Sequence, residues 1–107
     1  MKVVINKSHG SFGLSKKAME LYSVLKYGEN RVKDEGGHFY IKQSDGDLYD
    51  IEINRDDPLL AAVVEKIGED SWGDYAMLEV KEIPDGSEWE IEEYIGFERL
   101  RKPCTYY

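Results

Sequence analysis

The chain has little cysteine, little proline and no long hydrophobic run. Its one cysteine, Cys104, cannot form a disulfide within the chain, which is consistent with a reducing compartment. No apolar stretch approaches the roughly 20 residues that a membrane-spanning helix needs. The apolar segment after Met1 is also too short for a signal peptide. These absences predict a protein that stays in the cytoplasm where it is made and has no membrane partner.

The 107 residues are the length of one ordinary domain, and 41% of them are apolar, which is enough for a buried core. Neither an internal repeat nor a low-complexity segment divides the chain. We therefore predict one domain over residues 1–100, followed by a C-terminal tail over residues 101–107.

Charge is unevenly distributed along the chain, whose formal net charge is −8. Residues 1–33 carry seven basic and two acidic side chains, whereas residues 82–98 carry seven acidic side chains and no basic one. The overall excess of acid argues against direct binding of duplex DNA, which requires a basic face. The acidic stretch has two interpretations. Its carboxylates either mimic the phosphates of a nucleic acid and bind a basic protein partner, or they form the solvent-exposed face of strands.

Two helices are marked by capping residues. Ser15 precedes an apolar face of helical spacing over residues 16–27, and Asp56 or Asp57 precedes a denser apolar segment over residues 58–67. A glycine follows each segment, and the second segment also has a proline in its first turn. We expect the second helix to be largely buried.

The other apolar patterns predict strands. They cover residues 2–6, 38–42, 48–53, 76–80, 89–94 and 97–100. The last two flank Ile95-Gly96 and alternate apolar with acidic residues, which predicts a hairpin with one wet face. Together the elements predict a two-layer α+β domain. Its mainly antiparallel sheet has about five to six strands and carries both helices on one face.

A glycine-containing loop over residues 7–15 joins the first expected strand to the first expected helix. Glycines let a backbone direct its N–H groups toward one point, and a helix start adds unpaired donors and a positive dipole end. The spacing matches neither a Walker A motif nor a dinucleotide-binding motif. The loop therefore predicts an anion site, and the alternative is that its glycines only permit the turn. The expected anion ligands are Lys7, Ser8, Ser11, Ser15 and Lys16, with the backbones of Gly10 and Gly13.

Four further side chains are candidates for this site. Phe12 either stacks on a base or packs into the core, and we favour packing. His9 is able to bind a phosphate or act as a general base. Arg55 either binds an anion or stands beside aspartates that complement a helix dipole. Trp72 lies in a loop with Tyr75, where two aromatics would either hold a planar ligand or cover a core edge.

No metal or cofactor is expected. The three residues best suited to binding zinc, His9, His38 and Cys104, do not have the spacing of a zinc site. Catalysis by His9 lacks a visible nucleophile, so we expect a protein that is not an enzyme, with a phosphodiesterase as a third interpretation.

A set of ordered motifs resembles a family of small, mostly uncharacterised bacteriophage proteins. The motifs are Val-Val-Ile-Asn near the start, Gly-Ser-Phe-Gly-Leu-Ser, Arg-Asp-Asp-Pro-Leu, Ile-Pro-Asp-Gly and Trp-Glu-Ile-Glu-Glu-Tyr. The resemblance excludes residues 27–50 and the tail, and the chain has Ile95-Gly96 where the family usually has Asp-Gly. It implies a phage origin, a location in the cytoplasm of the infected bacterium and a role against host defence.

Two functions follow as expectations. The first is a homo-oligomeric protein that sequesters a phosphate-containing small molecule, with a cyclic nucleotide immune signal as the leading candidate. Its site would be the glycine loop and first helix, with basic residues on the phosphates and aromatics on the bases. The second is an acidic inhibitor that binds a host defence protein directly through the terminal hairpin.

Overall fold

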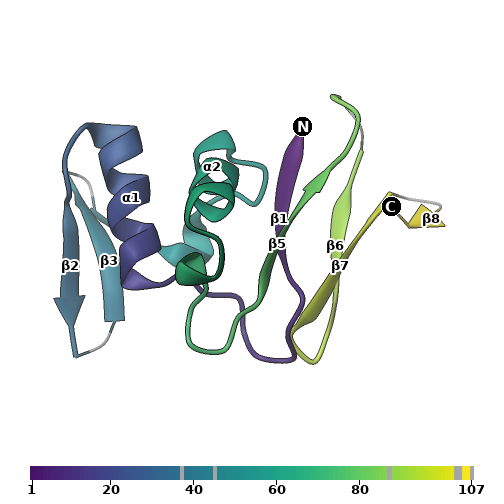
Figure 1. Cartoon of the computed structure of the whole chain (residues 1–107), viewed down its shortest axis with the longest axis horizontal. Helices are drawn as coiled ribbons and strands as arrows, with labels where there is room; N and C mark the ends of the chain where they lie inside the picture. The colour runs from purple at the N-terminus through teal and green to yellow at the C-terminus, as the bar shows by residue number, and fades with distance from the viewer. Residues whose placement is uncertain (37, 45, 87, 103–104, 107) are drawn as a thin grey trace.

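The fold is described from a computed structural model, over residues 1–36, 38–44, 46–86, 88–102 and 105–106 (Figure 1). Its helices are α1 (Lys16–Tyr27) and α2 (Pro58–Ile67), with short 3-10 helices η1 (Asp50–Glu52) and η2 (Gly68–Ser71). Its strands are β1 (Lys2–Asn6), β2 (Val32–Glu35), β3 (His38–Gln43), β4 (Gly46–Tyr49), β5 (Leu78–Glu82), β6 (Glu90–Tyr94), β7 (Phe97–Lys102) and β8 (Thr105–Tyr106).

Both predicted helices and their caps are confirmed. The Ser15 hydroxyl accepts the amide of Ala18 at the start of α1, and Gly28 ends the helix in the left-handed conformation, with φ at 78°. The Asp57 carboxylate accepts the amide of Leu59, which makes Asp57 the N-cap of α2. Helix boundaries were predictable because each cap needs only residues that are neighbours in the sequence.

The α+β class and the antiparallel pairing are confirmed, and the strands are distributed over three small sheets. β1 pairs with β5, β3 lies between β2 and β4, and β7 lies between β6 and β8. Both helices lie between the β2-β3-β4 sheet and the β1-β5 pair, instead of together on one face of a single sheet (Figure 1). The hairpin of β6 and β7 lies on the far side of β1 and β5.

Some strand boundaries differ from those predicted. The sequence pattern gave no indication of β2, because this edge strand is mostly charged and three of its four residues are exposed. The strand predicted over residues 48–53 ends at Tyr49, because η1 begins at Asp50. Ile51 of η1 is 73% exposed. Part of the turn before β4 lies outside the described residues. At the other end, β7 continues through Lys102 and β8 pairs with it, while Cys104 and Tyr107 lie outside the described residues.

β1 separates two apolar clusters and is buried on both faces. Val4 belongs to the larger cluster, which includes the inner faces of α1 and α2. Val3 and Ile5 point the other way, into a smaller cluster with Ile83 and Leu100. No helix in the described part of the chain has the length and apolar character to cross a membrane.

Candidate functional site

The glycine loop between β1 and α1 is held by hydrogen bonds to its own chain. Five of its amides donate to internal acceptors, including the Asp50 carboxylate. The other acceptors are two carbonyl oxygens and two polar side chains, one of them within the loop. The pairs are Lys7 with Met77 O, Ser8 with Asn6 Oδ1, Gly10 with Ser8 Oγ, Leu14 with Asp50 Oδ2, and Ser15 with Ser71 O. These five amides are therefore not available to an external anion.

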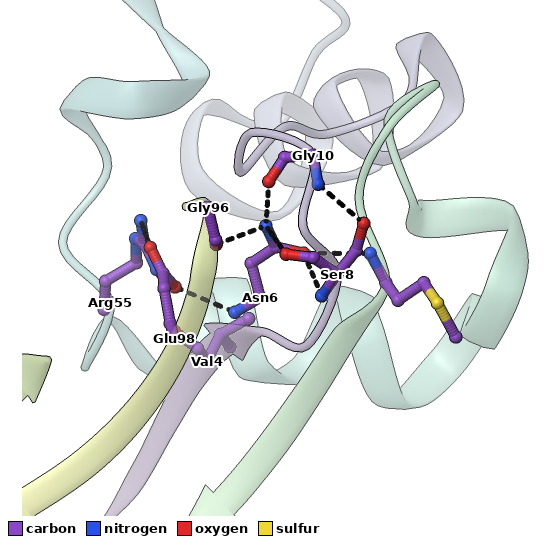
Figure 2. Close-up of polar contacts among 8 residues, drawn as sticks. Val4, Asn6, Ser8, Gly10, Arg55, Gly96 and Glu98 are labelled. Carbon is purple, nitrogen blue, oxygen red and sulfur yellow. Dashed lines mark hydrogen bonds and ion pairs between the residues drawn. The ribbon is translucent and has the colours of Figure 1, made fainter. Parts of the chain in front are cut away.

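Asn6, the last residue of β1, organises the loop from beneath (Figure 2). Its side chain is fully buried, and its Nδ2 donates to the carbonyl oxygens of Gly10 at 2.8 Å and Gly96 at 3.1 Å. Its Oδ1 accepts the amides of Ser8 at 3.2 Å and Met77 at 3.0 Å. One amide side chain thus joins the glycine loop, the segment before β5 and the β6-β7 turn.

A buried ion pair lies beside Asn6. The Arg55 guanidinium donates two hydrogen bonds to the Glu98 carboxylate, Nη1 to Oε1 at 2.5 Å and Nη2 to Oε2 at 2.9 Å. Glu98 is only 3% exposed and also accepts the amide of Asn6 at 2.8 Å (Figure 2). The guanidinium lies over the ring of Phe12, 3.6 Å from its centroid. Phe12 is partly buried and packs against the larger apolar cluster, as predicted, and the charge of Arg55 is matched by Glu98.

The glycines of this region allow backbones to approach closely. A Cβ on Gly10 would lie 2.1 Å from the carbonyl oxygen of Tyr75, and one on Gly96 would lie 2.2 Å from that of Gly10. A Cβ on Gly73 would lie 2.8 Å from the backbone of Gly13. The contacts explain these glycines without a ligand, because no larger residue fits at such distances.

One pocket opens beside the start of α1, and we call it the α1 pocket. Its volume is about 370 Å³. Three aromatic residues from three different segments line it together with the first turn of the helix. The lining residues that matter here are Ser15, Lys16, Phe39, Tyr49, Asp50 and Tyr75, together with Gly13 and Asp74.

Tyr49 is supported from behind by Tyr40. Their ring centroids are 5.7 Å apart. The Tyr40 hydroxyl donates to Glu35 at 2.9 Å, and this hydrogen bond is the main cause that raises the pKa of Tyr40 to about 12. Tyr40 therefore stays protonated to a higher pH than an ordinary tyrosine does.

A second pocket lies on the hairpin side of the glycine loop, and we call it the Arg55 pocket. Its volume is about 420 Å³. It is lined by residues of the loop, η1 and the β6-β7 hairpin. The lining residues that matter here are His9, Phe12, Ile51, Arg55, Glu93 and Ile95, with Ser11, Gly96 and Glu98. It shares none of these residues with the α1 pocket.

The predicted site residues are divided among several places instead of meeting in one site. Gly13, Ser15 and Lys16 line the α1 pocket, whereas His9, Ser11, Phe12 and Arg55 line the Arg55 pocket. Ser8 and Gly10 belong to the Asn6 network.

Lys7 and Trp72 lie elsewhere. Lys7 Nζ is 4.8 Å from the Phe97 ring centroid and 4.0 Å from Glu79, on the hairpin side, while Lys16 Nζ is 3.9 Å from Asp34 of β2. Trp72 forms a backbone bridge with Leu14 and packs against the larger apolar cluster. The basic residues of the loop therefore do not converge on one point.

Three important residues were not found by sequence reasoning. Asn6 carried one usable signal, since it is an amide at the end of a β-branched strand, directly before a glycine loop. Glu98 is indistinguishable by sequence from the other acids of the hairpin, and Phe39 stands in an ordinary strand pattern. Asn6 and Glu98 bond to each other across 92 positions of the sequence, and Phe39 lines the same pocket as Tyr75 of a distant segment.

The acids on one face of the hairpin are matched by arginines. Arg101 lies 2.7 Å from Glu90 and 3.5 Å from Glu92, and the β6-β7 register places Arg99 opposite Glu92. This face is therefore less negative than its sequence indicates. Within the described ranges, no group of three metal-ligating side chains is close enough to hold an ion.

Comparison with known proteins does not place the chain in a family. No family model matches it, and no curated protein or solved structure shows significant similarity to it. Functional inference therefore depends on the pockets themselves.

Proposed function

We propose that the chain is a non-enzymatic binding protein for a small nucleotide-type ligand, held in the α1 pocket. The observation that supports this is the convergence of three aromatic residues and Lys16 on one pocket of about 370 Å³. Pockets that bind small molecules are commonly about 300–1,000 Å³ and combine apolar walls with a few polar groups. The α1 pocket has both properties.

The aromatic walls favour a planar group such as a nucleobase. Tyr75 is 77% exposed and Tyr49 is 40% exposed, so both present ring surface that the fold itself does not cover. Stacking of a base on one such ring contributes about 1–3 kcal/mol. The Asp50 and Asp74 carboxylates at the pocket add acceptors for the amino groups of a base or the hydroxyls of a sugar.

Lys16 is the residue best placed to bind a phosphate. Its ion pair with Asp34 spans 3.9 Å between side chains that are about half exposed, and exposed pairs of this kind contribute little to stability. Replacing Asp34 with a phosphate as the partner of Lys16 therefore costs little free energy. The Asp50 carboxylate occupies the Leu14 amide, so the phosphate would bind at the Lys16 end of the pocket and not within the loop.

The biological use that we propose is sequestration. The resemblance to small phage proteins implies a role against host defence in the bacterial cytoplasm, and binding an immune signal without turnover would serve that role. A ligand bound between two subunits would be better enclosed than a ligand in one open pocket. We therefore still predict a homo-oligomer.

Thermal unfolding with a panel of compounds tests this proposal. The panel contains cyclic mononucleotides, cyclic dinucleotides, linear mononucleotides and ribose 5-phosphate. A ligand at 100 times its Kd stabilises the folded state by about 2.7 kcal/mol, which is easily detected. Recovery of the compound unchanged after denaturation supports sequestration, whereas a chemically altered compound indicates catalysis.

Paired variants locate the binding site. Tyr75→Ala and Lys16→Gln should each reduce the stabilisation, while Lys17→Gln removes the neighbouring exposed lysine and should leave it unchanged. The proposal is wrong if no compound raises the Tm, or if both pocket variants respond like the unmodified protein.

A further inference from the structure

We propose that the Arg55 pocket is a docking site for a basic side chain, arginine or lysine, of a partner protein. This inference does not depend on the nucleotide proposal, because the two pockets share no lining residue. The sequence analysis also predicted a direct protein partner, and this pocket would be the site where that partner binds.

The walls of this pocket suit the aliphatic part of such a side chain. Ile51 of η1 is 73% exposed and Ile95 of the β6-β7 turn is 66% exposed, and both line the pocket beside Phe12. Arginine and lysine bury their methylene groups on apolar surface while their charged ends stay polar. Grouped exposed apolar residues are also typical of interaction sites.

The backbone of Ile95 strengthens this interpretation. It is the only residue other than glycine, among those the structure describes, with a positive φ, at 48°. A β-branched residue is strained in this conformation, whereas Asn or Gly adopts it readily. Because Ile95 is exposed, the fold gains little from its side chain. Strain of this kind concentrates at functional sites.

Glu93 is the carboxylate of this pocket that a basic side chain would contact. Glu98 is neutralised by the two hydrogen bonds from Arg55, whereas Glu93, directly opposite Glu98 in the β6-β7 register, is exposed. No ion pair to Glu93 is found in the part of the chain that the structure describes.

The surroundings favour a protein over a small cation. A neighbouring pocket of about 400 Å³ also has His9 in its wall and is lined by Tyr94 and Phe97. Tyr94 is 71% exposed. Tyr94 and Phe97 lie on the opposite face of the hairpin from Glu93, together with Glu92 and Arg99, and the two pockets meet at His9. Exposed apolar side chains therefore flank the turn on both faces, and a partner protein that wraps around the turn would contact both pockets.

Amide NMR titration with the peptide acetyl-Gly-Arg-Gly-amide tests the docking site. The matched control is the same peptide with citrulline, which keeps the shape and removes the charge. We expect saturable shifts at His9, Ile51, Glu93 and Ile95 with the arginine peptide, and none with citrulline. Equal response to both peptides, absence of saturable shifts, or shifts confined to the α1 pocket would overturn the proposal.

Two variants separate recognition from folding. Glu93→Gln should weaken binding of the arginine peptide about tenfold, while Glu69→Gln, an exposed acid of η2, should not change it. Ile95→Asn should weaken binding yet raise the Tm, because it relieves the strained turn. A lower Tm for Ile95→Asn would mean that Ile95 serves the fold. A dimer that dissociates on Glu93→Gln would show that a second copy of the chain, and not another protein, is the occupant.

Discussion

The helix side and the hairpin side of β1 are stabilised by different forces. Among the residues that the structure describes, thirteen buried ones form a continuous apolar cluster on the helix side. On the hairpin side only four do so, and the buried polar residues Asn6 and Glu98 lie beside them. Apolar packing tolerates small changes of shape, whereas a hydrogen-bonded network depends on direction and fails when one member is lost. The comparison indicates that the hairpin side is held mainly by its polar network.

The largest effect should come from breaking the buried ion pair. Arg55→Met leaves the nearly inaccessible Glu98 carboxylate without its guanidinium, and removal of one partner of a buried pair typically costs about 3–5 kcal/mol. Urea unfolding followed by circular dichroism measures the loss. Adding Glu98→Gln to the same chain should restore part of the stability, since a neutral amide is less costly to bury. A loss under about 1 kcal/mol would refute the importance of the network.

The next effect tests close backbone packing on the hairpin side. Gly96→Ala should cost about 3 kcal/mol, because its Cβ would collide with the Gly10 carbonyl and the residue has a φ of 82°. Gly86→Ala is the matched control, with a φ of 78° and no atom within 4 Å of the added Cβ. The control should lose only about 1 kcal/mol, from backbone strain alone. Equal losses in the two variants would show that the contact with Gly10 does not matter.

A smaller effect is expected for a polar contact on the helix side. The Tyr22 hydroxyl donates to the Asp57 carboxylate at 2.6 Å, and Tyr22→Phe should cost about 1 kcal/mol at pH 7. Burial, with help from this hydrogen bond, raises the pKa of Tyr22 well above its ordinary value of 10.0. The folded state therefore keeps the phenol neutral while the unfolded chain ionises it, so stability falls as the pH rises above 10.

The same variant should weaken that alkaline dependence. Tyr22→Phe should show a shallower loss of stability between pH 10 and pH 12 in urea titrations, with a remainder contributed by Tyr40, whose pKa is raised to about 12. Tyr75→Phe, at an exposed hydroxyl, is the control and should match the unmodified protein. A Tyr22→Phe slope identical to that of the control would contradict the assignment.

The smallest effect separates two acids that face each other across the hairpin. Glu93→Gln should change stability by less than about 0.5 kcal/mol, because its side chain is exposed. Glu98→Gln in the otherwise unmodified chain should cost several times more. The same urea titration measures both variants, and a reversal of their order would mean that the charge of Glu93, not the buried pair, stabilises the hairpin.

Local features of this fold were predictable and long-range ones were not. Ser15, Asp57 and the Ile95-Gly96 turn could be identified because capping and turn formation depend on adjacent residues. The charged strand β2 could not, since only its pairing with β3 makes it a strand. The same reason explains the divided site. Gly10 packs against Tyr75 and Gly96, and no local pattern predicts which distant backbone a glycine will contact.

From Val3 onward β1 has no solvent-facing side, because Val4 packs in one apolar cluster while Val3 and Ile5 pack in the other. Opening either cluster exposes part of this strand and removes support from the other cluster. Heat or denaturant should therefore melt both halves in a single cooperative transition. The amides of these three residues should exchange with deuterated water more slowly than those of the exposed strand β2, at a rate set by global unfolding.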